Sequence, residues 1–465
     1  MTSPAEDQLP EDLLPATRRA LFRRIAVAQA EGRVPSVVGA VVRDGRLVWT
    51  GARSCVDGHA PDADTQYRIG SITKTFTAVL VMRLRDEGLL DLADPLERHL
   101  PGTGVGDSTI FQLLGHSAGL AAEAPGLWWE RTPGTLRPTL ADVLGEGPLL
   151  HTPGRRHHYS NPGYTLLGSL IEAKRGAPWE EVLRREVLEP LSLDRTTAQP
   201  VAPHAGAWAV HPWADVMLPE PAVDLGLMAS AGQLWSTAAD LCRFAVFLAE
   251  GDDRVLCAAS VREMAVPAAP PDPQDAVGGY GLGLQLVRRD GRALVGHTGS
   301  LPGFLAGLWV SVADGVAAVA LGNATGAPSI GWLGAELIAI VADAEPRIPE
   351  PWRPLPEVDP ALLELTGPWY WGTQAMTLKL AADGGVELHP LRGPGRGSRF
   401  EARPGGGWTG LDGYYAGEIL RVVRRADGSV RHLDLGSFVF TREPYDPEGD
   451  VPGGVDAEGW RGLAP

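Results

Sequence analysis

The chain has few cysteines, no long apolar run and no excess of positive charge. Its 465 residues include only 3 cysteines, Cys55, Cys242 and Cys257, which form no recognisable disulfide framework. We expect these cysteines to be small buried side chains rather than reactive thiols. The longest apolar segments fall short of the roughly 20 residues that a membrane-spanning helix needs. A formal net charge of −16 argues against binding to nucleic acid or to anionic membranes.

A secretion signal and a metal-binding pattern are missing as well. Residues 1–15 are acidic and polar, without the basic and apolar segments of a signal peptide, so we expect a cytoplasmic protein. That expectation disfavours a cell-wall peptidase. The doublet His157-His158 has no third ligand at a recognisable spacing, so we predict neither a metal nor another cofactor.

What the chain does contain is an ordinary globular composition, 44% hydrophobic and 21% charged, and enough length for two domains. A turn at Asp44-Gly45 between two strand-like segments predicts a hairpin near the N-terminus. Strand patterns return only after a long, helical and loop-rich middle. This order predicts one α/β domain over residues 16–343, whose two ends share a sheet. The expected helices are 16–32, 71–88 and 330–344, and the expected strands are 37–42, 46–49, 281–286, 293–297, 307–312 and 316–321.

A proline-rich segment, residues 344–360, is predicted to be a linker. Beyond it, short alternating segments separated by Gly and Asp turns predict a small all-β domain, a barrel, over residues 361–445. Residues 1–15 and 446–465 are expected to be tails. The expected strands of the barrel are 376–380, 386–389, 419–424, 430–435 and 438–440.

The most informative stretch of the sequence is residues 67–77. It places Ser71 at the start of an apolar helix and Lys74 three residues later, on the same helical face. A serine hydroxyl needs an adjacent base, and a lysine serves as that base only if burial or a nearby cation lowers its pKa. The positive N-terminal end of the helix favours negative charge at Ser71. A P-loop is excluded, because no glycine directly precedes Lys74.

A second motif is Tyr159-Ser160-Asn161. A tyrosine phenolate beside a lysine ammonium can act as a general base, and the Asn161 amide can hydrogen-bond both the lysine and a substrate amide. The alternative is an ordinary turn before a helix, since Ser-Asn-Pro-Gly is typical of turns.

A third motif, residues 297–300, follows a strand and reads His297-Thr298-Gly299-Ser300. Its small residues would let a substrate backbone pair beside the strand. The N–H groups of Ser300 and Ser71 could form an oxyanion hole. The alternative is a strand edge with a solvated histidine.

His116 lies within residues 109–120, which we predict to be a helix ending in a glycine-rich loop. We interpret it as structural, holding the loop by hydrogen bonds, because a lysine–tyrosine pair leaves it no necessary catalytic role. Two tryptophan-rich segments, 128–131 and 208–213, are candidate walls of the site, with plain packing as the alternative for both.

Together these motifs resemble the serine β-lactamase and penicillin-binding-protein superfamily, and most closely its class C-like branch, which also holds esterases, D-aminopeptidases and DD-carboxypeptidases. The resemblance covers residues 16–343. It implies a β-lactamase-like α/β fold, with an antiparallel sheet, helices on both of its faces and an all-helical region. It also implies roles for the motif residues: Ser71 as acylated nucleophile, Lys74 and Tyr159 as proton relay, and Asn161, His297, Gly299 and Ser300 as substrate-binding residues.

The sequence departs from the family pattern at His297, where class C β-lactamases and many penicillin-binding proteins carry lysine. Loss of a permanent cation weakens capture of a carboxylate at neutral pH. A protonated His297 would mimic that lysine weakly at pH 6. The departure therefore favours peptidase, esterase or acyl-transfer activity over antibiotic resistance.

The C-terminal β domain resembles the lipocalin-like domains appended to some D-aminopeptidases and to penicillin-binding-protein-type thioesterases. The expected function is a serine hydrolase with an acyl-enzyme on Ser71, acting on a small ester or on a peptide amide, including one with a D-residue. A thioesterase or peptide cyclase is a second hypothesis, and a non-catalytic ligand-binding protein of the same fold is a third. The expected partner is a small-molecule or peptide substrate, and the sequence does not indicate an oligomeric state.

Overall fold

The computed structural model describes residues 13–132, 139–270, 278–327, 329–349, 351–355, 357–381, 384–446, 449–450 and 454. The chain divides into two compact units, Met1–Ile348 and Pro349–Pro465, and each is described on its own below. Within the described ranges, none of the helices is both long and apolar enough to cross a membrane.

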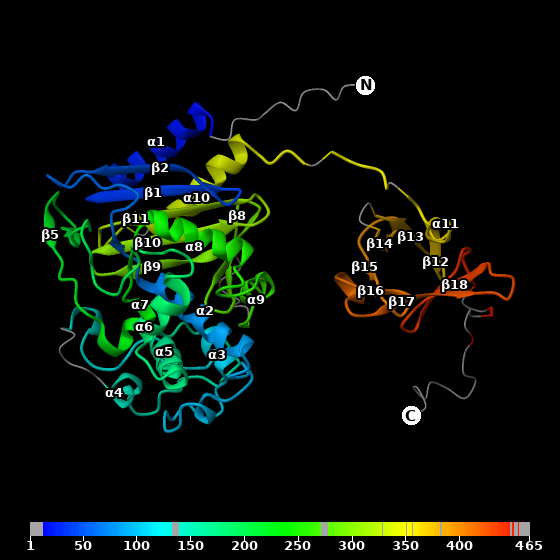
Figure 1. Ribbon diagram of the computed structural model, residues 1–465, viewed down its shortest axis with the longest axis horizontal. Helices are drawn as coiled ribbons and strands as arrows, with labels where there is room; N and C mark the ends of the chain where they lie inside the picture. The colour runs from blue at the N-terminus through cyan, green and yellow to red at the C-terminus, as the bar shows by residue number, and fades with distance from the viewer. Residues whose placement is uncertain are drawn as a thin grey trace. The chain divides into compact units, whose positions relative to one another are not determined.

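The described part of the first unit is built on a seven-stranded antiparallel sheet, in the order β2-β1-β11-β10-β9-β8-β7 (Figure 1). The N-terminal hairpin pairs with the last strand, and Val37 lies opposite Gly322. The two ends of the unit therefore share one sheet, as predicted. The strands are β1 (Ser36–Arg43), β2 (Arg46–Ser54), β7 (Gly278–Tyr280), β8 (Gln285–Arg289), β9 (Arg292–Leu301), β10 (Phe304–Ser311) and β11 (Val316–Gly322).

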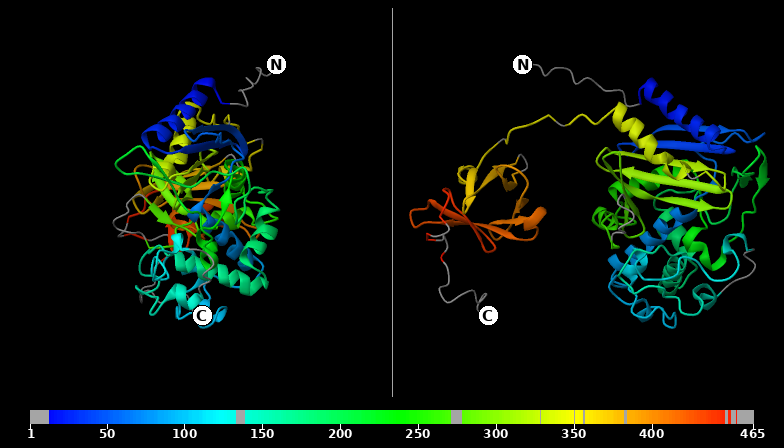
Figure 2. Two further views of the ribbon diagram at one scale, coloured as in Figure 1. Left: turned by 90° about the vertical axis from the view of Figure 1, so that its left-hand side faces the viewer. Right: turned by 180° about the vertical axis from the view of Figure 1, so that it is seen from behind.

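Helices cover both faces of this sheet (Figures 1 and 2). On one face, α1 (Pro15–Glu31) and α10 (Ser329–Ala344) pack together and against the strands, and α8 (Ala238–Glu250) covers the other face. Strands β10 and β11 are buried along their whole length, because a sheet covered on both faces needs continuous apolar runs. The predicted β-lactamase-like fold class is confirmed.

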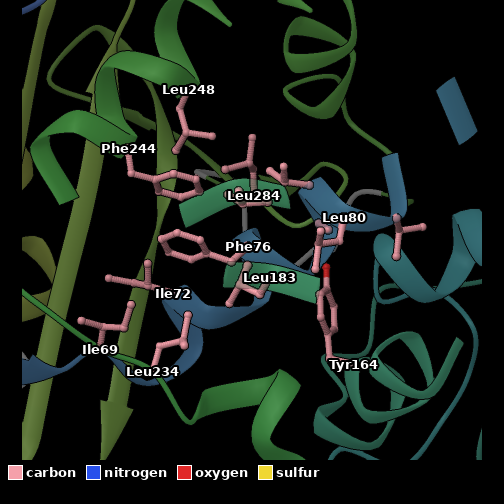
Figure 3. Packing of buried hydrophobic residues seen from close by; sticks show 14 of the residues in the cluster. Ile69, Ile72, Phe76, Leu80, Tyr164, Leu183, Leu234, Phe244, Leu248 and Leu284 are labelled. Carbon is pink, nitrogen blue, oxygen red and sulfur yellow. The ribbon is translucent and has the colours of Figure 1, made fainter. Parts of the chain in front are cut away.

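The all-helical region surrounds α2 (Thr73–Asp86), which is buried on nearly all sides. Figure 3 shows its residues Phe76 and Leu80, and Ile72 just before it, packed among side chains from other elements. Phe76 stacks on Phe244 of α8, with ring centroids 3.8 Å apart. This packing fixes the N-terminal end of α2, which carries the first motif. The other helices of the region are α3 (Ile110–Leu114), α4 (Leu140–Leu144), α5 (Asn161–Arg175), α6 (Trp179–Leu183), α7 (Ala229–Gly232) and α9 (Ala258–Met264).

Two sequence-based expectations are wrong in this unit. Most of the strand predicted over residues 281–286 is instead the turn between β7 and β8, where Gly281 N–H donates to Leu284 O at 2.8 Å and Gly283 adopts a φ of 78°. Of the three cysteines, all free, only one is buried. Cys55 and Cys257 are exposed and Cys242 is buried.

The described part of the second unit is a nearly closed barrel of eight antiparallel strands in sequential order. It closes where Tyr370 and Thr441 exchange backbone hydrogen bonds of 2.7 and 2.9 Å. The predicted barrel is confirmed, although β12, β15 and β16 were not predicted. After the short helix α11 (Pro360–Leu363) come β12 (Gly367–Trp371), β13 (Gln374–Leu380), β14 (Val386–Pro390), β15 (Ser398–Ala402), β16 (Trp408–Gly410), β17 (Ile419–Arg424), β18 (Val430–Leu435) and β19 (Phe438–Phe440).

Candidate active site

The first and third motifs meet where the turn before α2 lies against β9. Strand β3 (Tyr67–Arg68) leads into a 3₁₀ turn, Gly70–Ile72, that contains Ser71. Gly70 has a φ of 50°, and a Cβ on it would lie 2.6 Å from the backbone nitrogen of Ser300. A Cβ on Gly299 would lie 1.9 Å from the carbonyl oxygen of Ile69. Both glycines are needed for this close approach, which brings the backbones of Ser71 and Ser300 together.

Lys74 lies one helical turn beyond Ser71, and its side chain is fully buried. Its Nζ lies 3.0 Å from Ser71 Oγ and donates to the carbonyl oxygen of Ala231 at 2.7 Å. Burial lowers the pKa of Lys74 to about 7, although the carboxylates of Glu123 and Glu130 oppose this shift. A substantial fraction of Lys74 is therefore a neutral amine near pH 7. Its lone pair can accept the proton of Ser71, and burial supplies the lowered pKa that a lysine needs to act as a base.

Tyr159 faces the same two residues from the segment that precedes α5. Its ring centroid lies 4.9 Å from Lys74 Nζ, and its hydroxyl lies near enough to Ser71 for that serine to act on its pKa. Burial raises the pKa of the Tyr159 phenol well above its usual value, and the Glu123 carboxylate adds to the shift. The phenolate suggested by the sequence is therefore disfavoured. Of the two groups, the neutral amine of Lys74 is the one that can accept a proton near pH 7, and the Tyr159 phenol keeps its proton.

Asn161 begins α5, but its amide makes a contact that the sequence did not predict. Its Nδ2 donates to both carboxylate oxygens of Glu123, at 2.9 and 3.0 Å. Lys74 Nζ donates to Ser71 and Ala231 rather than to the amide oxygen of Asn161. Glu123 also accepts a 2.8 Å hydrogen bond from the indole of Trp129. Asn161 therefore connects the second motif to a loop that carries two glutamates.

We call residues 121–132 the acidic loop. Besides Glu123, it contains Glu130, which accepts a hydrogen bond from the Trp128 indole at 2.8 Å. Burial raises the pKa of Glu130, and the charge of Glu123 adds to this shift. The loop is tied to the end of β5 (Met217–Pro219) by an ion pair of 2.6 Å between Arg131 and Glu220. The first candidate wall, residues 128–131, thus lies beside the predicted site, because its Glu130 raises the pKa of Lys74.

His297 lies on β9 with only 1% of its surface exposed. Its Nδ1 donates to the carbonyl oxygen of Thr298, and its Nε2 accepts a hydrogen bond of 3.0 Å from the Tyr280 hydroxyl. Burial lowers the pKa of His297 to about 3, and the charge of Lys74 adds to this effect. The ring is therefore neutral at both pH 6 and pH 8. The expectations of a solvated histidine and of a partly protonated one at pH 6 are both wrong.

Three groups of the site were missed by sequence reasoning: Glu123, the carbonyl of Ala231 and the hydroxyl of Tyr280. Glu123 has no distinctive spacing to any motif, and a backbone carbonyl leaves no trace in residue identity. Of the second candidate wall, Trp213 is 90% exposed, so plain packing does not explain it. Trp208 lies at the start of the short strand β4 (Trp208–Val210) and is partly buried.

Comparisons with known proteins identify the family of the first unit. The family model described as "Beta-lactamase" matches residues 21–343, and a second model, described as a domain of unknown function (DUF7586), matches residues 358–442. Penicillin-binding protein 4 of Amycolatopsis lactamdurans is 31% identical to this chain, over 72% of this chain and 93% of the relative.

Two solved structures are similar to this chain. The octameric penicillin-binding protein homologue from Pyrococcus abyssi is 24% identical, with a TM-score of 0.63, over 91% of this chain and 99% of its own, and it supports the fold alone. A D-stereospecific amidohydrolase from Streptomyces sp. is 28% identical, with a TM-score of 0.54, over 70% of this chain and 97% of its own.

Proposed function

The chain belongs to the β-lactamase family, and on this premise we propose that its first unit is a serine hydrolase that forms an acyl-enzyme on Ser71. One observation carries the proposal. The fully buried Nζ of Lys74 lies 3.0 Å from Ser71 Oγ, with a pKa lowered to about 7. A buried lysine without a reaction to serve would be a cost to folding, because an alkylammonium loses its hydration there. Beside a serine hydroxyl, the same burial makes the amine an effective base.

In the acylation step, the neutral amine of Lys74 accepts the proton of Ser71 while Oγ forms a bond to the substrate carbonyl carbon. Negative charge moves to the carbonyl oxygen, which the N–H groups of Ser71 and Ser300 would stabilise. The bond to the leaving alcohol or amine then breaks. Tyr159 gives its proton to that leaving group and receives one from the Lys74 ammonium, so that the relay returns to its starting charge.

In the second step, the acyl group leaves Ser71 for an acceptor. Water gives its proton to the relay and attacks the ester carbon, and the bond to Oγ breaks as Ser71 is protonated again. The proton transfers of this reaction involve only Ser71, Lys74 and Tyr159. A substrate amine could take the place of water, which would make the enzyme a thioesterase-like cyclase instead.

The charges around the site favour a neutral or amine-bearing substrate over one with a carboxylate. His297 stays neutral. The negative charges of Glu123 and Glu130 in the acidic loop lie close enough to Lys74 to raise its pKa. A substrate ammonium would be attracted there, and a substrate carboxylate would be repelled. The amidohydrolase from Streptomyces supports D-residue amides as the first compounds to test. Simple nitrophenyl esters are the matching neutral probes.

A covalent probe tests the proposal directly. A fluorophosphonate should label the wild-type chain once, and Ser71→Ala should abolish the labelling in intact-mass spectrometry. Ser169→Ala is the matched control, because this serine lies on α5 outside the site, and it should label like the wild type. Full labelling of Ser71→Ala would refute the nucleophile assignment. Absence of labelling in the wild type would favour a ligand-binding protein without catalysis.

The products then separate hydrolysis from acyl transfer. With 4-nitrophenyl acetate, a hydrolase releases acetate and nitrophenol in equal amounts. If a nucleophilic amine such as glycinamide diverts most of the acetyl group to an amide at millimolar concentration, transferase or cyclase activity is the better description.

A further inference from the structure

One residue, His116, binds the backbone on both sides of Tyr159. The backbone N–H of His158 donates to the carbonyl oxygen of His116 at 2.7 Å. The backbone N–H of Ser160 donates to the Nδ1 atom of the His116 ring at 3.1 Å. That ring also lies 4.1 Å from the ring of Tyr159, measured between centroids. His116 therefore contacts Tyr159 and both of its neighbours, an arrangement that we call the His116 clamp.

The conformation of His116 carries two local energetic penalties, one in its backbone and one in its side chain. It follows α3 with a φ of 54°, in the left-handed region that favours glycine or asparagine. Its side chain is only 2% exposed, and its Nε2 has no hydrogen-bond partner in the described part of the chain. Because Nδ1 accepts from Ser160, the N–H of the neutral ring must be on Nε2, where it is buried without a partner. A residue that served packing alone would avoid both penalties.

We propose that His116 is a positioning residue that orients Tyr159 toward Ser71 and Lys74 through the hydrogen bonds accepted by its Nδ1 and carbonyl oxygen. This inference rests on the proposed function, in which Tyr159 passes a proton to the leaving group. The ring itself takes no part in proton transfer, because Ser160 occupies Nδ1. Burial and the nearby charge of Lys74 also hold the pKa of His116 well below its usual value, so the ring stays neutral.

Other contacts hold the same segment, so we expect loss of the clamp to loosen Tyr159 rather than release it. Ser160 Oγ donates to the carbonyl oxygen of Ala121 at 2.7 Å, and the backbone N–H of Asn161 donates to Ala122 at 2.9 Å. The hydroxyl of Tyr159 would then sample positions away from Ser71. A displaced acid–base group lowers kcat while leaving substrate binding, and therefore KM, nearly unchanged.

Two substitutions separate the hydrogen bond from the backbone conformation. His116→Asn keeps an acceptor at the δ position and tolerates a positive φ, but it lacks the imidazole ring. His116→Gly tolerates the same φ and lacks the acceptor. With 4-nitrophenyl acetate, we expect kcat within about threefold of wild type for His116→Asn and about tenfold lower for His116→Gly, with KM changed less than twofold in both.

The decisive measurement repeats His116→Gly in a Tyr159→Phe background. If the clamp acts through the Tyr159 hydroxyl, the glycine substitution should lower kcat by less than twofold there, because the group that it orients is already gone. The same tenfold loss in both backgrounds would overturn the proposal and leave His116 a structural residue. If the glycine variant does not fold, His116→Asn decides alone, since a tenfold loss of kcat in that variant would also overturn it.

The proposed function and the clamp fail in different ways. Fluorophosphonate labelling of Ser71 tests the former and requires no change at His116. If Ser71 labels normally while the two backgrounds respond equally to His116→Gly, only the clamp is refuted. If Ser71 does not label, the serine hydrolase itself is refuted.

Discussion

The two sides of the candidate site differ in almost every physical respect. The inner side consists of Ser71, Lys74, Tyr159 and His297, which are carried by helices, a strand and a hydrogen-bonded segment, and which are largely buried. The opposite side is the acidic loop, where Glu123 is exposed and Glu130 is partly exposed. Groups with strongly shifted pKa values lie on the inner side, because burial is the main cause of those shifts. In the proposed function, the buried side performs the chemistry and the loop adjusts substrate choice.

The largest effect should come from the inner side. We expect Lys74→Ala and Tyr159→Phe each to lower kcat by on the order of 10² or more, the usual scale for a lost acid–base group. The double variant should be little worse than the poorer single one, because the two side chains form one relay. Lys174→Ala, on the far end of α5, is a matched control and should keep wild-type kcat. Multiplicative losses in the double variant would show that one of the two residues is only structural.

An effect of intermediate size should appear in the pH profile of kcat/KM, because the charges of the acidic loop raise the pKa of Lys74 on the inner side. Lys74 must be deprotonated to accept the proton of Ser71, so kcat/KM should increase as pH passes its pKa of about 7. For one such group, the increase from pH 6 to pH 8 is about tenfold. Glu123 and Glu130 both raise the pKa of Lys74. Glu123→Gln should therefore shift the acid limb of the profile to lower pH.

The same variant tests substrate choice. Loss of the Glu123 charge should lower the preference for an amine-bearing D-residue amide over its N-acetylated counterpart by about fivefold, the scale of an exposed ion pair. Glu31→Gln, at the end of α1 on the opposite face of the sheet, is the control and should change neither the profile nor the preference. An unmoved acid limb in Glu123→Gln would contradict the electrostatic coupling between the two sides.

The smallest effect is expected at His297. Because its pKa lies at about 3, the ratio of kcat/KM for a carboxylate-bearing β-lactam to that for a neutral ester should receive no contribution from His297 protonation between pH 6 and pH 8. The pH dependence that both substrates share through Lys74 cancels in this ratio. The ratio should therefore change by less than about twofold. A ratio that rises at pH 6 in the wild type but stays flat in His297→Gln would show that His297 does titrate there.

The sequence predicted the inner side better than the loop. The spacing of Ser71 and Lys74 follows from helical periodicity, and the sheet followed from alternating strands at both ends of the domain. The acidic loop could not be predicted, because the contact between Glu123 and Asn161 joins residues 38 positions apart through irregular backbone. The proposed direction of proton transfer also required the structure, because burial lowers the pKa of Lys74 and raises that of Tyr159. In the barrel, β15 and β16 were not predicted, because they are short strands between glycine-rich turns.

The pairing of β1 with β11 has a consequence for the synthesis of the protein on the ribosome. Ser71 is synthesised early, but the strand that packs against its turn comes much later, since Ser300 lies 229 residues further along. At about 5–20 residues per second, that interval lasts about 10–45 s. Throughout it, the nascent chain carries Ser71 without β9, and the sheet cannot close until β11 has been made. The candidate site of this topology therefore remains incomplete until nearly the whole first unit has emerged.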